Sequence, residues 1–597
     1  MISSKTTASI RIIALILFSL IFIAVSIGYL NFSFTQLRTI IEPFLLLLIC
    51  TLLVILIARS KISLLVKKVE MFYLLFISYI VTKNILENTF DISSIGYMLF
   101  FVLLYYGLKS FFSIINIAAY SFALLFATVI ILIAYLVFAL HHCYIEKETL
   151  TNLFTPNKSI FSILLASQIV FILPLWLFSR NSNTRFRLVT WICFVVIVAS
   201  LLLLGFTKGR AGWIGLLLAV FYIVYQYLLN TAVKKTVLYL LFPLFSIITS
   251  LLFLYKTDSS NGRLLIYKVS SNILRDNWLF GIGHGQFKVQ YNEYQAAYFS
   301  THSIDSKEAL LADNSFYAFN DFLQLFIENG LIGLLIVAVA LYFFGVQIKR
   351  TKTNIKNKYL FTASVASLIC IFSSSLFSYS LQIFPVAIQA ILCLSIINSY
   401  PSQQKPSIDF SERSRKILIA GLFFLSVVLL IHFSFYFAYK TKTGQALELK
   451  RTGFKQQSIK KYQALNNSYI KEGNALYLYA QELYYSNQLE KAAKILSIGK
   501  RYYSSNEVYK LSASIENELQ NYAQAEKDYK TVIYMVPNRM IIRSNLLDFY
   551  IERKDTANAI YWANSIIHMP VKIPTNNTEI IQQKTKEILS QLNLVYK

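Results

Sequence analysis

The sequence predicts an all-α polytopic membrane protein with about thirteen transmembrane helices, one large loop outside the cytoplasm and a C-terminal helical repeat domain. The chain is 56% hydrophobic, 14% of its residues are charged, and its mean hydropathy is +0.54. These values exclude a disordered chain and an ordinary soluble enzyme. The net charge of +26 fits Lys and Arg gathered in cytoplasmic loops, and no groove-reading motif accompanies it. We therefore expect a membrane and no nucleic acid as partner.

Apolar runs, most of them about 17 to 25 residues long, give the candidate spans. They lie near residues 10–30, 39–58, 69–84, 93–108, 117–139, 160–179, 188–206, 211–231, 236–255, 322–348, 359–379, 382–399 and 417–438. The first run has no small-residue cleavage site after it, so we expect it to be retained. The runs predict helices 1–9 in residues 1–255, a polar loop over 256–329, helices 10–13 in 330–438, and a soluble domain over 439–597.

The charge pattern predicts the orientation. Lys and Arg concentrate in every second connection, as in the segments 59–68 and 349–358, and the connections between them carry far fewer. The positive-inside rule then places the N-terminus in the cytoplasm. The 256–329 loop and the tail after Ala438 are both expected on the opposite side.

The tail changes from membrane periodicity to amphipathic helices. Similar segments at 488–492, 521–525 and 555–559 recur at intervals of 33 and then 34 residues. Small residues at this interval, followed by Pro537, resemble tetratricopeptide repeats, in which stacked helix pairs bury a shared core. A generic domain of helical hairpins is the alternative. Either domain is expected to bind a protein partner rather than to perform chemistry.

Two cations lie between neighbouring spans in the motif Thr-Lys-Gly-Arg-Ala-Gly-Trp (207–213). Gly209 and Gly212 are expected to permit a tight reversal, which would hold Lys208 and Arg210 at the bilayer edge. Fixed cations in that low-dielectric place suit a lipid-linked phosphate. The alternative is a pair of snorkelling side chains at helix ends.

The large loop begins with an amphipathic pattern. Asn261 is a candidate N-cap, and Arg263 beside a helix N-terminus would form an anion site. A polar, basic stripe follows on one predicted helix face; it consists of Lys268, Ser271, Asn272 and Arg275. Such a helix is suited to the membrane interface, although an ordinary surface helix has the same pattern.

Glycines alternate in Phe-Gly-Ile-Gly-His-Gly (280–285). No Lys-Ser/Thr follows them, so a tight turn is a better interpretation than a nucleotide-binding loop. His284 and His302 are candidate acid–base groups in this loop. The alternative is a structural role, which is the more common one for a lone histidine in a loop.

Four motifs in order resemble the bacterial O-antigen ligase/polymerase superfamily. They are Thr-Lys-Gly-Arg-Ala-Gly-Trp (207–213), Asn-Gly-Arg (261–263), Trp-Leu-Phe-Gly-Ile-Gly-His-Gly-Gln-Phe (278–287) and Asn-Asp-Phe-Leu-Gln-Leu-Phe-Ile-Glu-Asn-Gly-Leu-Ile-Gly (320–333). The resemblance implies a glycosyltransferase of the bacterial inner membrane with a periplasmic loop and tail. It implies a glycan donor on undecaprenyl diphosphate, and an acceptor that is the lipid A core, a glycan or a protein.

The resemblance also implies roles for particular residues. Arg210 and Arg263 match the family's arginine positions, so they are the candidates to clamp the departing diphosphate, with Lys208 assisting. Lys268, Arg275 and Asn320 are further candidate substrate-binding residues. No Asp-x-Asp motif and no cluster of histidines or cysteines indicates a metal, and no cofactor is expected.

One position departs from the family pattern. Phe319 stands where the family has a histidine before Asn320, and phenylalanine accepts no proton. Asp313, Asp321, His284 or His302 could supply the base instead. Asp321 and Glu328 share a predicted helix face, although carboxylates at that spacing are usually solvated. The acceptor could also need no strong base, or catalysis could be lost.

The sequence leaves four functions open. A ligase or protein O-oligosaccharyltransferase is the leading hypothesis, and a polysaccharide polymerase of the same superfamily follows it closely. A transporter of lipid-linked glycans would show duplicated spans and deeply placed polar groups. A catalytically silent scaffold would recruit partners through the repeats.

Overall fold

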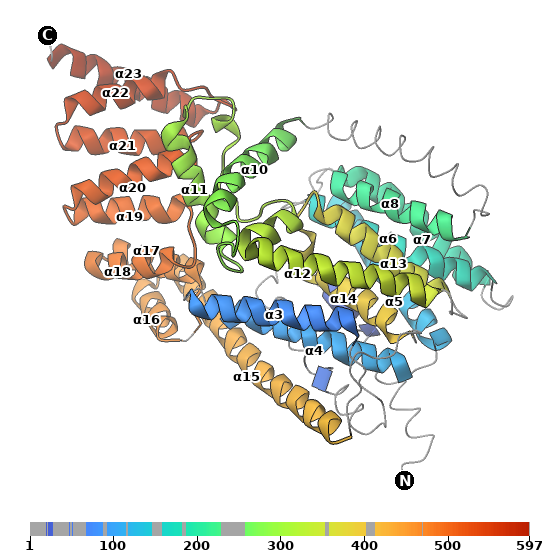
Figure 1. The fold of residues 1–597 in the computed structure, drawn as a ribbon. Coiled ribbons are helices and arrows are strands. Elements are labelled where there is room, and N and C mark those ends of the chain that lie inside the picture. Colours follow the sequence, from blue (N-terminus) through green and yellow to red (C-terminus); the bar gives the residue numbers. More distant parts are fainter. Residues whose placement is uncertain are drawn as a thin grey trace. The chain divides into compact units, whose positions relative to one another are not determined.

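The structure is a computed structural model that describes most of the chain. The described residues are 19–20, 22–27, 47, 50–51, 67–87, 92–114, 117–145, 158–181, 187–227, 257–352, 358–400, 412–468 and 470–595. Across these ranges every regular element is a helix, as the sequence predicts (Figure 1). Two compact units form: unit 1 comprises residues 1–254, 319–323 and 332–438, and unit 2 comprises 255–318, 324–331 and 439–597.

Ten helices coincide with ten of the predicted spans. They are α3 (Lys68–Leu86), α4 (Ile92–Ile114), α5 (Ile117–Ile145), α6 (Lys158–Asn181), α7 (Arg187–Thr207), α8 (Arg210–Tyr227), α12 (Asp321–Lys352), α13 (Lys358–Ser375), α14 (Phe384–Ser399) and α15 (Glu412–Arg451). Within the described ranges, nine of them are long and apolar enough to cross a membrane, and α14 is a shorter apolar helix. The predicted spans near 10–30 and 39–58 lie mostly outside the described residues, and that near 236–255 lies wholly outside them.

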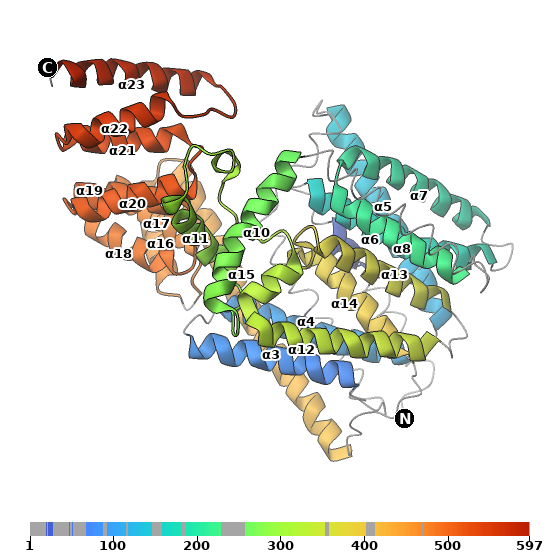
Figure 2. The same ribbon diagram turned by 45° about the horizontal axis from the view of Figure 1, so that its top comes forward.

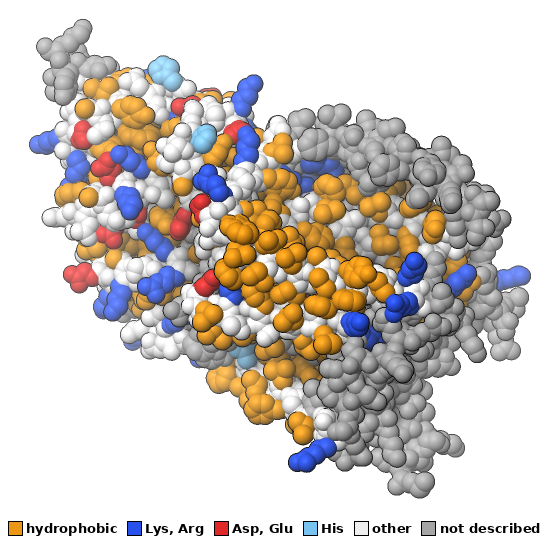
Figure 3. Space-filling view, viewed as in Figure 1, with side chains coloured by type: hydrophobic (Ala, Val, Ile, Leu, Met, Phe, Trp, Pro, Cys, Tyr) orange, Lys and Arg blue, Asp and Glu red, His pale blue; other side chains and the backbone are white. Residues whose placement is uncertain are grey.

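Unit 1 buries α13 against α6, α8 and α14. The short 3₁₀ helix η4 (Ser380–Gln382) joins α13 to α14. The outward face of α12 is apolar, because Leu335 and Tyr342 are 54% and 67% exposed. Figure 3 shows this broad hydrophobic surface over α12, as expected of a helix that faces lipid.

The structure corrects the expectation that Gly209 and Gly212 form the reversal between α7 and α8. The reversal between α7 and α8 falls on Lys208, which has a φ of 53°. Gly209 and Gly212 instead allow α8 to approach α6, since a Cβ atom on them would lie 2.2 and 2.5 Å from atoms of Ser162. A side chain at either position would push the two helices apart.

The tail of unit 2 is a stack of helix pairs (Figure 2). Its helices are α16 (Lys455–Asn466), α17 (Gly473–Tyr485), α18 (Leu489–Lys500), α19 (Asn506–Glu518), α20 (Tyr522–Met535), α21 (Met540–Glu552), α22 (Thr556–Ile567) and α23 (Asn576–Val595). Each recurring segment starts the second helix of a pair, and its alanine, at 492, 525 or 559, is fully buried. The helical repeat is therefore present, and its membership of the tetratricopeptide family stays a prediction.

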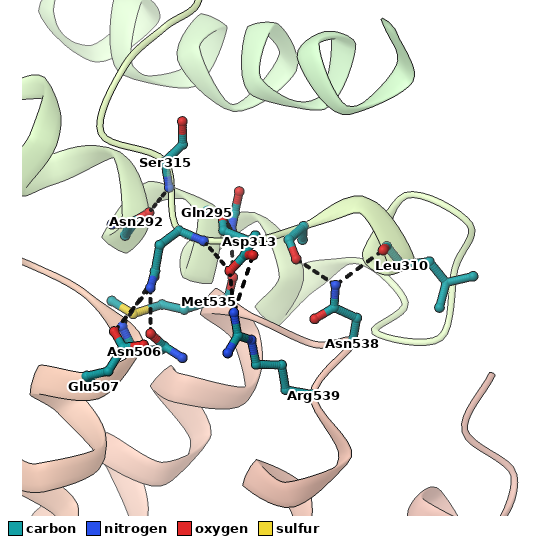
Figure 4. Close-up of polar contacts among 12 residues, drawn as sticks. Asn292, Gln295, Leu310, Asp313, Ser315, Asn506, Glu507, Met535, Asn538 and Arg539 are labelled. Atoms are coloured by element: carbon teal, nitrogen blue, oxygen red, sulfur yellow. Dashed lines mark hydrogen bonds and ion pairs between the residues drawn. The ribbon is translucent and has the colours of Figure 1, made fainter. Parts of the chain in front are cut away.

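The loop before α12 packs against this stack within unit 2. It contains α10 (Thr257–Asn277), α11 (Phe287–Thr301) and the 3₁₀ helix η3 (Ala309–Leu311). Gln295 Nε2 donates to the Met535 carbonyl at 2.6 Å, and Asn538 Nδ2 donates to the Ala312 carbonyl at 2.9 Å (Figure 4). Both segments must therefore lie on one side of a membrane, which fits the four apolar helices, α12 to α15, that separate them in the chain.

Candidate active site

The glycine-rich turn between α10 and α11 is fastened to the first half of α12. Ile282 N–H donates to the Ile327 carbonyl at 3.0 Å, and Gly283 N–H donates to the Glu328 carbonyl at 2.9 Å. Gly281, Gly283 and Gly285 all have positive φ, which L side chains rarely adopt. The prediction of a tight turn at 280–285 is confirmed.

This turn brings His284 to the buried carboxylate of Glu328. His284 Nδ1 lies 3.4 Å from Glu328 Oε2, with side chains 28% and 3% exposed. Glu328 Oε1 also accepts a hydrogen bond from Gln324 Nε2 at 3.0 Å and one from the Phe287 N–H at 3.4 Å. Phe287 begins α11, so the positive end of that helix faces the carboxylate.

The pair has the geometry of an oriented base. A buried carboxylate beside one imidazole nitrogen favours the tautomer that carries its proton on that nitrogen. The other nitrogen, Nε2, is then the proton acceptor. Of the candidate bases predicted from the sequence, His284 is therefore the one whose described contacts include a buried carboxylate.

Residues 319–321 have different partners, within unit 1. The Asn320 side chain caps α12, since its Oδ1 accepts from the N–H groups of Phe322 and Leu323 at 3.0 and 3.1 Å. Asp321 Oδ2 accepts from the Leu381 N–H at 2.9 Å, which ties α12 to η4. These contacts give both side chains a structural task, and their predicted functional roles stay predictions.

Phe319 is held in a strained conformation. Its φ is 52°, and its ring packs edge-to-face on Tyr379 with centroids 5.3 Å apart. Non-glycine residues adopt this backbone region only when the surroundings enforce it, and such positions are common at functional sites.

Asp313 and His302 have local partners. Asp313 accepts from Arg539 Nη2 at 3.0 and 3.3 Å, which joins the loop to the repeats (Figure 4). His302 stacks on Tyr298 with ring centroids 4.0 Å apart, and its Nδ1 lies 2.8 Å from the Tyr298 carbonyl. The described contacts of His302 include no buried carboxylate, in contrast to those of His284, and Asp313 is engaged by Arg539.

The amphipathic helix α10 is present, but it begins earlier than expected. Its first residue is Thr257, so Asn261 lies inside the helix and is not its N-cap. Thr257, Asp258 and Ser259 precede it and are residue types that favour the start of a helix. The prediction of an anion site at a helix N-terminus beside Arg263 is therefore wrong. Arg263 instead lies half-buried in the first turns of α10.

The predicted stripe on α10 is only partly available to a ligand. Leu265, Val269 and Ile273 are buried, while Lys268 and Arg275 are exposed. Lys268 forms an ion pair with Glu308, and this hydrogen bond lowers the pKa of Glu308 and raises that of Lys268. Arg275 Nε lies 3.6 Å from the neighbouring Asp276.

In unit 1, Arg210 is the first residue of α8, and Lys208 lies in the turn before it. Arg210 is half-buried and Lys208 is exposed. Two cations at a helix N-terminus add to the partial positive charge of the unpaired N–H groups there. This arrangement favours an anion such as a diphosphate.

The sequence reasoning missed the partners of His284. Gln324 and Glu328 stand four residues apart, so they share one face of a helix. That spacing is a visible signal in the sequence, and it groups Glu328 with Gln324 rather than with Asp321. For metals, no group of three His, Cys, Asp or Glu side chains in the described part of the chain could hold an ion.

A comparison with known protein families matches the part of the chain that contains these candidate site residues. Residues 159–338 match the family model described as O-antigen ligase. The match includes α6 to α8, the loop with His284, and the first half of α12 with Glu328. No curated protein matches the chain.

Proposed function

Because residues 159–338 match the family model described as O-antigen ligase, we propose that the chain transfers a glycan from undecaprenyl diphosphate to an acceptor hydroxyl, with His284 as general base. The family match supports the coarse activity, that of a membrane glycosyltransferase or ligase of this superfamily. The donor, the residues and the acceptor are the proposal.

The contact between His284 and Glu328 carries this proposal. A hydroxyl attacks an anomeric carbon faster when its proton leaves to a positioned base. Neutral His284 would take that proton at Nε2, and Glu328 would stabilise the imidazolium that forms. This pair compensates for Phe319, which stands at the position of the family histidine and accepts no proton.

The transfer balances without a further reactant. The acceptor oxygen bonds to the anomeric carbon, the bond from that carbon to the diphosphate oxygen breaks, and undecaprenyl diphosphate leaves as an anion. Arg210 and Lys208 at the start of α8 are the proposed leaving-group contacts, since positive charge near the departing oxygens lowers the barrier. Arg263 is a further candidate for this role.

We place unit 2 on the periplasmic side of a bacterial inner membrane. The packing of the loop on the repeats, with four apolar helices between them in sequence, supports one common side for both. The charge pattern supports a cytoplasmic N-terminus. The lipid A core, a growing glycan and a protein hydroxyl are all acceptors that such a site could use.

The test is a transfer assay with the purified full chain, undecaprenyl-diphosphate-linked glycan from the host, and host membranes as the acceptor source. His284→Ala should lower transfer by about 10²- to 10⁴-fold, and Arg210→Ala should also reduce it strongly. His302→Ala is the matched control, because it removes a histidine of the same loop without the Glu328 contact. The product distinguishes a ligase from a polymerase, since a polymerase lengthens the glycan on its carrier.

Retained transfer in His284→Ala would overturn the assignment of the base. Retained transfer in both His284→Ala and Arg210→Ala would contradict both proposed roles. Unchanged donor levels with the natural chain would favour the silent scaffold.

A further inference from the structure

A groove lies beside the contact between α11 and the repeat stack, inside unit 2. Its volume is about 760 Å³, and residues of α11 and of α18 to α20 line it. This volume falls in the range of about 300–1,000 Å³ that small-molecule sites occupy. The α11 residues that face it are Glu293, Ala296, Ala297 and Ser300, which form one helix face.

The charges of this groove cancel. Its ionisable lining consists of Lys500, Lys527, Lys530, Glu293, Glu526 and Asp528, three of each sign apart from the tyrosines. Lys500 Nζ lies 3.1 Å from Asp528 Oδ2, and Lys530 Nζ lies 2.6 Å from Glu526 Oε1. The groove therefore favours a ligand without net charge over a diphosphate or a nucleic acid.

Its polar and aromatic walls are ordered in advance. The Tyr509 hydroxyl donates to Glu293 Oε1 at 2.8 Å, and Lys500 Nζ lies 4.3 Å from the centroid of the Tyr509 ring. Gln524 Nε2 donates to Asp528 Oδ1 at 2.8 Å. Groups already held in place lose little entropy when a ligand binds.

We propose that this groove binds a neutral stretch of glycan. A sugar ring has an apolar C–H face that packs on an aromatic ring, and hydroxyls that both donate and accept hydrogen bonds. Tyr534 supplies a half-buried ring, Gln524 supplies an amide, and small side chains such as Ala297 and Ala523 leave room. The choice of glycan rests on the proposed function.

A peptide fits these walls less well. Peptides commonly bind by main-chain pairing with an exposed sheet edge, through charged anchors, or as an amphipathic helix in a hydrophobic groove. The described groove walls are helices, whose backbone groups pair internally, their charges cancel, and their lining contains no Leu, Ile, Val, Met or Phe side chain.

The groove and the His284 site share α11. Phe287, at the start of this helix, contacts Glu328, and the groove begins six residues later. With a rise of 1.5 Å per residue, the groove faces of Glu293 and Ser300 lie about 9 to 20 Å along the helix from Phe287. A glycan chain that reacts at one end could thus be held by the same helix further along.

The test measures binding by the full chain in detergent to an array of neutral and acidic oligosaccharides and unglycosylated peptides. Calorimetry with the best neutral oligosaccharide follows. Tyr534→Ala and Gln524→Ala should each weaken binding about tenfold or more, and Tyr534→Phe should retain it. Tyr561→Ala is the control, because Tyr561 is 62% exposed elsewhere on the repeats.

The proposal of a glycan-binding groove would be overturned if the chain bound peptides alone, or if neither Tyr534→Ala nor Gln524→Ala weakened oligosaccharide binding. If Tyr534→Ala fails to fold, the exposed Gln524→Ala decides the question. His284→Ala should bind the oligosaccharide normally while losing transfer. The two proposals can therefore fail separately. A groove that binds no glycan does not affect the test of His284 as the base, and an active His284→Ala variant does not affect the test of glycan binding in the groove.

Discussion

Arg543 Nη1 lies 2.9 Å from Asp305 Oδ1, so a buried guanidinium of the repeats holds the loop before α12. The Arg543 side chain is only 1% exposed and also donates to the carbonyls of Ile304 and Pro537 at 3.1 Å each. Burial lowers the pKa of Arg543, and Asp305 opposes that effect. The repeats therefore support the loop that carries His284.

Arg543→Ala should destabilise unit 2 by at least about 1–3 kcal/mol, since it leaves the buried carbonyls of Ile304 and Pro537 without their donor. Arg539→Ala is the comparison, because its pair with Asp313 is 45% and 59% exposed and is worth at most about 1 kcal/mol. Thermal unfolding gives the two costs, and hydrogen exchange around residue 304 reports release of the loop. Equal losses of stability in Arg543→Ala and Arg539→Ala would contradict the greater contribution assigned to the buried contacts of Arg543.

His284→Ala should lower kcat by about 10²- to 10⁴-fold, the usual contribution of a general base. Glu328→Gln should lower kcat with little change in KM, because it disturbs the orientation of the base and not the binding of the glycan. Steady-state kinetics of transfer check both expectations. A change confined to KM would indicate that the pair binds substrate instead.

Gly281→Ala should destabilise the turn by more than about 1–3 kcal/mol. The φ of Gly281 is +75°, and a Cβ atom would lie 2.5 Å from the backbone nitrogen of Gly330. Gly262→Ala should instead stabilise α10 by about 0.5–1 kcal/mol, since its Cβ atom meets open space inside a helix. Thermal melts of both variants should shift in opposite directions.

Glu526 should make unit 2 less stable in acid. Its hydrogen bond with Lys530 lowers its pKa below 4.5, and the Tyr550 hydroxyl adds to this effect. A lowered carboxyl pKa contributes stability that is complete above the unfolded value and is lost as the pH falls through the folded value. The contribution is about 0.2–1 kcal/mol for a pair this exposed.

Glu526→Gln should therefore melt below the natural chain near neutral pH and together with it in acid. Melting between about pH 3 and 7 tests this. Glu587→Gln, which changes an exposed carboxylate of α23, should match the natural chain throughout. A constant gap at every pH would show that Glu526 acts by packing alone.

The sequence by itself determined the helical class, the ten described spans and the helix pairs of the tail. These features depend on local periodicity, because lipid or a neighbouring helix must cover each apolar face. It also identified His284 as a candidate base. Residues next to one another in the chain were sufficient for these inferences.

Only the tertiary structure decided which side chains meet. The pairing of His284 with Glu328, 44 residues apart, depends on the turn at 280–285 docking on α12. The attachment of the loop to the repeats joins Asp305 to Arg543 across more than 200 residues of chain. Such contacts have no periodic signal, because they arise when separate elements pack and bring distant side chains within hydrogen-bond range.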